Sequence, residues 1–255
     1  MTKSLGQNWI LLRGLTREAA HCGGFVPQLQ SAFPDAQISL LDLPGAGRFY
    51  KEKSPATIAG IMEKVRGFAL DQGLLQKPVR VLALSLGAMV TWEWMLTYPQ
   101  DICGSTLVGT SFGGLSPFYH RLRWQSYGRI TRLIMQKKIY DRELAILQLV
   151  SNRRDQDHFI AEQWLQIQKE RPVSLKNSYR QILASSNYRP GDRKPKPPVL
   201  LLNGKRDRLV APECSEAIKR KWDYQLITHP WGGHDLPIDD GLWVVSQLKN
   251  WVRSK

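Results

Sequence analysis

The chain has 255 residues, of which 42% are hydrophobic and 23% charged, as in globular proteins with a substantial core. Its formal net charge of +14 at pH 7 favours acidic partners, such as nucleic acid, an anionic membrane or an acidic protein. Since the sequence shows no zinc-finger spacing, no RNA-binding aromatic motif and no continuous basic tail, we expect no nucleic-acid partner.

The apolar runs and the cysteines indicate the cellular compartment. The first apolar run, 9–12, ends at Arg13 and is too short for a signal peptide or a membrane span, and no later run is long enough to cross a bilayer. The three cysteines, Cys22, Cys103 and Cys214, are far apart and odd in number, which is typical of thiols in a reducing environment. We therefore expect a cytoplasmic protein without a membrane span.

Short apolar runs alternate with amphipathic segments in the first 114 residues. The runs 9–12, 38–41, 79–84 and 105–108 predict buried strands. Apolar residues at helical spacing predict helices over 25–33 and 58–68 and after residue 85, with Ser54 and Pro55 as N-cap and first residue of the second helix.

The pattern changes between residues 115 and 193. Strand signals stop, and helices are predicted at 130–139, 143–150 and 159–167. Strands return at 199–202 and 224–229, with helices at 214–222 and 241–252. Strands that alternate with helices predict a mostly parallel sheet covered on both faces. The expected fold is therefore an α/β core of residues 1–114 and 195–255 with an inserted helical cap of residues 115–194.

A serine follows the third predicted strand and precedes a helix. The segment 83–87 reads Ala-Leu-Ser-Leu-Gly, which is the G-x-S-x-G pattern with alanine in the first glycine position. Small residues two positions before and after Ser85 permit the sharp turn that exposes its hydroxyl at the edge of the sheet. The turn alone is a weak signal, because many strand-to-helix turns contain serine and glycine for backbone reasons.

Two further polar residues follow later strands in the order expected of a catalytic triad. A serine hydroxyl needs a base to take its proton and a group that orients the base. Asp207 follows the strand at 199–202, and His234 lies in a glycine-rich loop after the strand at 224–229. Because the carboxyl ends of parallel strands meet at one edge of the sheet, Ser85, Asp207 and His234 are expected to converge. Backbone N–H groups of Leu15 and Leu86 are the expected oxyanion donors.

These motifs together resemble the α/β-hydrolase superfamily across the whole chain. The segments that carry the resemblance are 13–15, 42–47, 84–87, 204–207 and 233–234. The layout is similar to the capped carboxylesterases, including those that cleave carrier-protein methyl esters in biotin synthesis. The resemblance implies a serine esterase that needs no metal or cofactor. Arg13 stands where relatives usually have histidine, and we expect it at the mouth of the site, where it would favour an anionic group.

The excess positive charge is concentrated in the expected cap. Residues 121–193 contain 15 Lys and Arg but 7 Asp and Glu. A cap of this kind covers the acyl pocket in the family, so basic residues there are candidates for docking an acidic acyl carrier protein. A solvated charged face on amphipathic helices is an equally simple interpretation. The candidate substrate- or partner-binding residues are Arg13, Arg121, Arg123, Arg129, Arg132 and Arg142.

Several functions stay open at this stage. The preferred hypothesis is hydrolysis of a carboxylic ester, either small or carried by an acyl carrier protein. The same triad also serves short-chain esterases, thioesterases and enzymes that hydrolyse C–C bonds. An acyl-binding protein of the same fold without catalysis is the alternative from another functional class.

Overall fold

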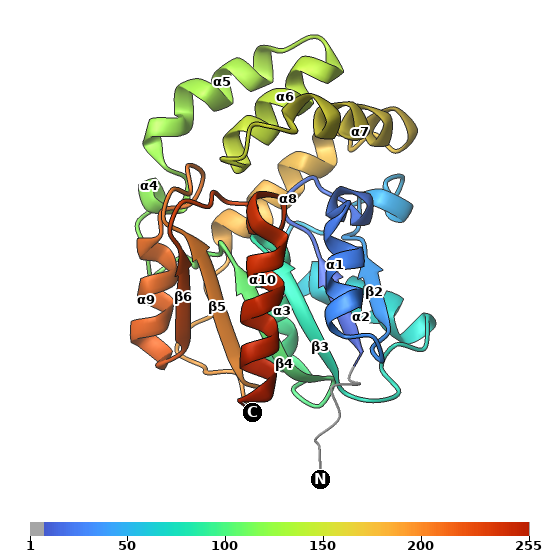
Figure 1. Ribbon diagram of the computed structural model, residues 1–255, viewed down its shortest axis with the longest axis vertical. Coiled ribbons are helices and arrows are strands. Elements are labelled where there is room, and N and C mark those ends of the chain that lie inside the picture. Colours follow the sequence, from blue (N-terminus) through green and yellow to red (C-terminus); the bar gives the residue numbers. More distant parts are fainter. Residues whose placement is uncertain (1–7, 255) are drawn as a thin grey trace.

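The computed structural model describes residues 8–254 and shows a parallel sheet of six strands (Figure 1). The spatial order is β2-β1-β3-β4-β5-β6, and every neighbouring pair is parallel. The carboxyl ends of all six strands therefore meet at one edge, as expected. The strands are β1 Trp9–Leu12, β2 Ile38–Leu41, β3 Val79–Leu84, β4 Ile102–Val108, β5 Val199–Gly204 and β6 Gln225–His229.

Helices cover both faces of the sheet. On one face, α1 (Phe25–Ala32) and α10 (Leu236–Arg253) pack together over apolar side chains such as Leu82 and Leu200. On the other face, α2 (Ile58–Asp71), α3 (Leu86–Thr97) and α9 (Glu213–Trp222) enclose a second apolar cluster that includes Trp92. Burial of strand residues on both sides explains why the strands read as continuous apolar runs. The predicted parallel sheet with helices on both faces is thus confirmed.

Several helix boundaries differ from the predicted ones, and the predicted helix over 130–139 is divided between two helices, 127–135 and 139–150. Ser54 does not cap α2, because the chain first turns again and Thr57 takes the N-cap position, where its side chain accepts a hydrogen bond from the N–H of Gly60. The last helix, α10, starts at Leu236 rather than Gly241, and its backbone is not helical at Asp240. A short segment before a break in the helix lacks the apolar repeat from which the helix was predicted.

Helices and turns alone separate β4 from β5 among the described residues. They are α4 (Phe118–Arg121), the 3-10 turn η3 (Trp124–Ser126), α5 (Tyr127–Met135), α6 (Ile139–Val150), α7 (Asp157–Glu170) and α8 (Leu175–Asn187). Figure 1 shows α5, α6 and α7 as a layer over one end of the core. A small apolar cluster around Leu147, Trp164 and Ile167 joins α6 to α7. The exact limits of a separate cap, 115–194, remain a prediction, and α4 and α8 were not predicted.

Buried polar contacts hold this helical layer to the loop after β1. Arg17 forms an ion pair of 2.6 Å with Glu143 on α6, and both side chains are buried. Glu18 pairs with Arg171 at the end of α7 at 2.7 Å. The side chain of Gln181 on α8, which is fully buried, accepts a hydrogen bond from a backbone N–H of the same loop. The layer is therefore fixed to the core at several points.

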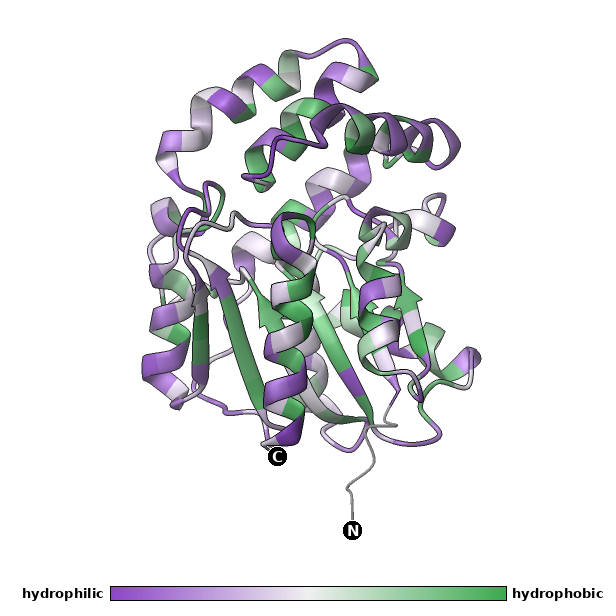
Figure 2. Cartoon of the chain, viewed as in Figure 1, coloured by the Kyte–Doolittle hydropathy of each residue, from purple (hydrophilic) through white to green (hydrophobic). Residues whose placement is uncertain are grey.

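The hydropathy of the chain follows this arrangement. Figure 2 shows apolar strands inside the core and predominantly hydrophilic segments on the outer helices. Within residues 8–254, none of the helices combines the length and the hydropathy that a membrane crossing requires.

Candidate active site

Ser85 lies in a strained turn between β3 and α3. Its φ of 51° and ψ of −111° are unusual for a residue with a side chain, and such conformations cost about 1–3 kcal/mol. The backbone is held there by two contacts with the end of β4: the N–H of Ser85 donates to the carbonyl of Val108 at 2.9 Å, and the hydroxyl of Thr110 donates to the carbonyl of Ser85 at 3.2 Å. The fold thus maintains the predicted serine elbow.

Two glycines allow the chain to pack against this turn. A Cβ at Gly87 would lie 2.6 Å from the carbonyl oxygen of Arg13, and a Cβ at Gly14 would lie 3.2 Å from the Cβ of Ser85. The loop after β1 therefore passes directly beside the serine. Such a close approach of backbones requires residues without side chains.

Asp207 and His234 are in direct contact near this edge. Nδ1 of His234 lies 2.7 Å from Oδ2 of Asp207, and both side chains are buried. The other oxygen, Oδ1, accepts hydrogen bonds from the N–H groups of Leu209 and Val210 at 2.7 and 2.9 Å. Because an ionised carboxylate only accepts, Nδ1 carries a proton and Nε2 of neutral His234 is left as the acceptor.

Gly109 brings His234 to the same strand end as Ser85. A Cβ at Gly109 would lie 3.0 Å from Nδ1 of His234, so the imidazole packs against the backbone of this residue. Gly109 stands between Val108 and Thr110, the two residues that bond to the backbone of Ser85. The serine and the histidine therefore flank one short segment after β4.

The surroundings of His234 shift its protonation. Burial disfavours the charged imidazole, but the negative charge of Asp207, its hydrogen bond to the ring and the charge of Asp235 outweigh burial and raise the pKa of His234. Arg13 acts in the opposite direction. The site thus stabilises the imidazolium that a base forms when it takes a proton.

Backbone donors lie on both sides of the serine. Leu86 is the first residue of α3, where N–H groups have no partner within the helix. Leu15 follows Gly14 in the adjacent loop. No hydrogen bond between described residues uses either N–H. Neither N–H is thus used within the part of the fold that the structure describes, and their role as oxyanion donors stays a prediction.

Comparisons with known proteins identify the family of this chain. A model of the alpha/beta hydrolase family matches residues 16–247. The chain belongs to this family. A pimeloyl-[acyl-carrier protein] methyl ester esterase from Methylococcus capsulatus is 27% identical over 228 residues, which cover 86% of this chain and 84% of that protein.

Solved esterase structures share the fold of this α/β hydrolase. The esterase RhEst1 from Rhodococcus has a TM-score of 0.76 and 16% identity, covering 99% of this chain and 92% of its own. A thermophilic esterase from Thermogutta terrifontis has a TM-score of 0.72 and 17% identity, with 98% and 90% covered. At these identities the likeness shows the fold.

Arg13 is not placed as expected in this α/β hydrolase. Its side chain is buried and forms an ion pair with Asp235, so it presents no unpaired charge to a ligand at the mouth of the site. The expectation rested on the sequence position of Arg13 beside Gly14. The partner that neutralises it lies 222 residues away and could not be recognised from local sequence.

The cap arginines fall into two groups. Arg121 donates to the last carbonyls of α8, Arg123 donates to the backbone carbonyl of Asp207 at 2.5 Å, and Arg142 lies 3.7 Å from Glu143. These three have partners within the protein. By contrast, Arg129 and Arg132 on α5 are exposed and form no hydrogen bond or ion pair with a described residue.

Sequence patterns did not reveal the acidic residues that support the His234 loop. Asp235 and Asp239 are both buried, and Asp235 holds the N-cap position of α10 without a capping hydrogen bond from its side chain. Asp239 accepts hydrogen bonds from Ser151 at 2.6 Å and from the N–H groups of Asn152 and Gly233. It therefore connects the His234 loop to the end of α6. Because Ser151 and Asn152 lie far from Asp239 in the chain, the local sequence gives no sign of this role.

The aromatic residues of the cap also divide. Trp164 is buried and packs against Leu147 and Ile167 between α6 and α7. Trp124 and Tyr127 are 62% and 39% exposed at the junction of η3 and α5. α5 packs mainly against α6 and η3.

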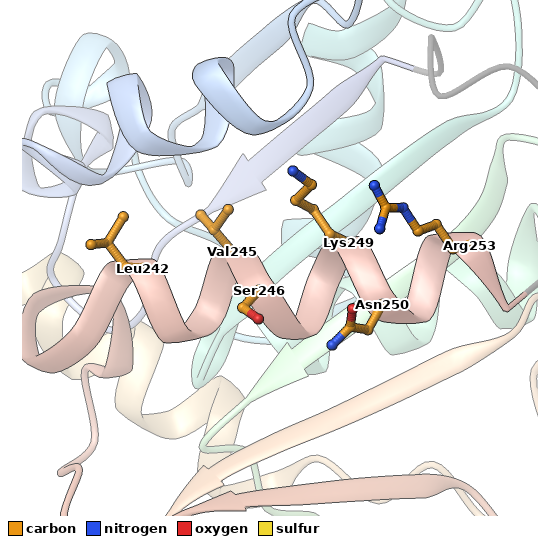
Figure 3. A pocket seen from close by; sticks show the side chains of 6 residues that line it. All are labelled: Leu242, Val245, Ser246, Lys249, Asn250 and Arg253. Atoms are coloured by element: carbon orange, nitrogen blue, oxygen red, sulfur yellow. The ribbon is translucent and has the colours of Figure 1, made fainter.

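A surface pocket on α10 is separate from the candidate site. Figure 3 shows that it is a feature of one face of this helix, and none of Ser85, Asp207 and His234 contributes to it. Its lining residues are Leu242, Val245, Ser246, Lys249, Asn250 and Arg253.

Proposed function

We propose that this α/β hydrolase cleaves a carboxylic ester through an acyl-enzyme on Ser85. The contact of 2.7 Å between His234 and Asp207, at the strand end that also holds the strained serine, carries the proposal. Asp207 fixes the imidazole with Nε2 free to accept a proton. The raised pKa of His234 favours its role as the base that becomes an imidazolium.

The reaction then follows from these groups. His234 takes the proton of the Ser85 hydroxyl as its oxygen attacks the ester carbonyl, and N–H groups of Leu15 and Leu86 stabilise the oxyanion. The tetrahedral intermediate collapses when His234 protonates the leaving alcohol. Water, deprotonated by the same imidazole, attacks the acyl-enzyme, and a second intermediate releases the carboxylic acid and the free serine.

We propose an acyl group on an acidic carrier protein as the substrate. The relative from Methylococcus capsulatus is named for a carrier-protein methyl ester, and it spans most of both chains. Four exposed cations support this assignment, because α5 and the turn after it carry them without an acidic residue between them. They are Arg129, Arg132, Lys137 and Lys138.

The nucleophile is tested by intact mass after treatment with a fluorophosphonate. The wild type is expected to gain one adduct, and Ser85→Ala is expected to gain none. An adduct that persists in Ser85→Ala would show that the nucleophile is a residue other than Ser85. A folded wild type without an adduct would favour an acyl-binding protein of the same fold.

The carrier is tested by comparing one acyl ester in free form and on a carrier protein. We expect hydrolysis of the carrier-bound ester alone to fall as salt rises, because screening weakens contacts between surface charges. Arg129→Glu with Arg132→Glu should raise KM for the carrier-bound ester. Lys219→Glu with Arg220→Glu, on exposed positions of α9, changes the net charge equally and is the matched control. Equal effects of both variants, or equal salt dependence of both esters, would favour a general short-chain esterase.

A further inference from the structure

A buried ion pair joins the two loops that flank the candidate nucleophile. Arg13 is the residue after β1, next to Gly14, and Asp235 directly follows His234. The guanidinium contacts both carboxylate oxygens, with Nη1 3.2 Å from Oδ1 and Nη2 close to Oδ2. The side chains are 4% and 6% exposed. The pair thus lies away from solvent and bridges two loops. These are the oxyanion loop, which carries Gly14 and Leu15 after β1, and the His234 loop after β6.

The backbone of each partner is held beside a reacting group. The carbonyl of Arg13 packs against Gly87, two residues after the nucleophile, and Gly14 packs against Ser85 itself. On the other loop, the N–H of Asp235 donates to the carbonyl of Val150 at 2.9 Å. A displacement of either side chain would therefore move an oxyanion donor relative to the base.

The pair also affects the base electrostatically. The charged groups that act on His234 are Asp207, Asp235 and Arg13. Asp235 favours the imidazolium and Arg13 disfavours it, so the two members of the intact pair oppose each other at the imidazole. Removal of one partner would leave a buried charge next to the imidazole, and the sign of that charge depends on which partner is removed.

We infer that Arg13 and Asp235 are positioning residues that fix the oxyanion loop against the His234 loop and hold the imidazole in its working charge environment. The inference rests on the proposed function of Ser85 and His234. This role can be distinguished from a purely structural one. If the ion pair only supported the fold, the two single variants would not shift the acid midpoint of activity in opposite directions.

The test measures the rate of Ser85 labelling by a fluorophosphonate and kcat/KM on a p-nitrophenyl ester, both from pH 5 to 9. Arg13→Met leaves Asp235 unpaired and is expected to move the acid midpoint upward by about one pH unit. Asp235→Asn leaves Arg13 unpaired and should move it downward by about as much. Arg13→Met with Asp235→Asn should restore the wild-type midpoint.

Two further variants separate geometry from charge and from stability. Arg13→Lys keeps the charge but loses the two-pronged contact, so kcat should fall at least about tenfold while the acid midpoint is unchanged. Arg66→Met breaks the ion pair of 2.7 Å between Arg66 and Asp101, which joins α2 to the opposite end of the sheet. This control should lower stability and leave the midpoint in place.

Each outcome bears on one claim. If the wild type labels but the Arg13→Met and Asp235→Asn midpoints stay together or move in the same direction, the inference is wrong and the proposed nucleophile stands. If the wild type does not label, the proposed function fails. If Arg13→Met does not fold, Asp235→Asn and the double variant still decide, since their midpoints must differ.

Discussion

Nδ1 of His234 and Oδ2 of Asp207 lie 2.7 Å apart, although 27 positions separate them in the chain and each follows a different strand. The parallel sheet brings β5 and β6 together, with Gly204 paired to His229, so that the loops after both strands start at the same level. A Cβ at Gly204 would lie 2.2 Å from the carbonyl of Gly232, which shows how closely these loops pass. The contact therefore depends on strand register and on glycine in both loops.

Asp207→Asn should reduce kcat/KM for a carboxylic ester about 10⁴-fold. The amide can still accept hydrogen bonds from Leu209 and Val210, so the fold should remain, but an amide stabilises neither the correct tautomer nor the imidazolium. Circular dichroism controls for folding. A loss of less than tenfold would remove Asp207 from the proposed triad.

Activity should fall as the pH drops through the raised pKa of His234. Burial alone would lower that pKa, but the charge and hydrogen bond of Asp207 and the charge of Asp235 outweigh it. The base acts only when neutral, so the acid midpoint of kcat/KM is expected above 6.5, the ordinary pKa of histidine. The measurement is kcat/KM at constant ionic strength, and a midpoint below 6 would contradict the expectation.

Gly109→Ala should damage both activity and stability. Gly109 has a φ of +57°, and its added Cβ would press on the imidazole of His234. We expect about 1–3 kcal/mol lower stability and a clear loss of kcat/KM. Gly191→Ala is the matched control, because Gly191 has a φ of +68° but open space around its Cβ. The activity per folded molecule of Gly191→Ala should be unchanged. Equal losses of kcat/KM in both variants would mean that backbone strain, and not contact with His234, causes the loss.

Arg17→Met should destabilise the protein by up to about 3–5 kcal/mol, because it removes the partner at 2.6 Å from the buried carboxylate of Glu143 and leaves it only the more exposed Arg142 at 3.7 Å. Arg17→Met with Glu143→Leu removes both charges and should recover much of that loss. Urea denaturation of the single and double variants measures the coupling. Similar losses in Arg17→Met and the double variant would show that the pair does not anchor the cap.

His21 should make the protein less stable in mild acid. Burial and the nearby charges of Arg17 and Arg13 lower the pKa of His21 well below its usual value. Below pH 6.5, His21 therefore binds a proton in the unfolded chain but stays neutral in the folded chain. This difference lowers the free energy of unfolding by up to about 1.4 kcal/mol per pH unit. Denaturation from pH 7.5 to 5.5 should show a smaller decrease for His21→Gln than for the wild type. An equal decrease would assign the acid sensitivity elsewhere.

The sequence by itself determined the order in which strands and helices follow one another along the chain, the parallel sheet and the family. Continuous apolar runs such as 9–12 and 79–84 must be buried on both faces, and that requirement defines the core wherever the rest of the chain lies. The same runs fix which residues follow a strand, so Ser85, Asp207 and His234 could be selected as candidates without coordinates. Short helices were missed or displaced where apolar spacing was weak, as in α4 and the first turn of α10.

The tertiary structure decided which charges remain free and which are paired. Arg13, Asp235 and Glu143 look like ordinary charged residues in the sequence, yet each is buried against a partner at least 126 positions away. Arg129 and Arg132 have the same residue type and remain exposed. Ion pairing acts over a few ångströms in space and leaves no periodic pattern in the chain, so only the folded arrangement distinguishes an arginine that joins two loops from one that a partner can reach.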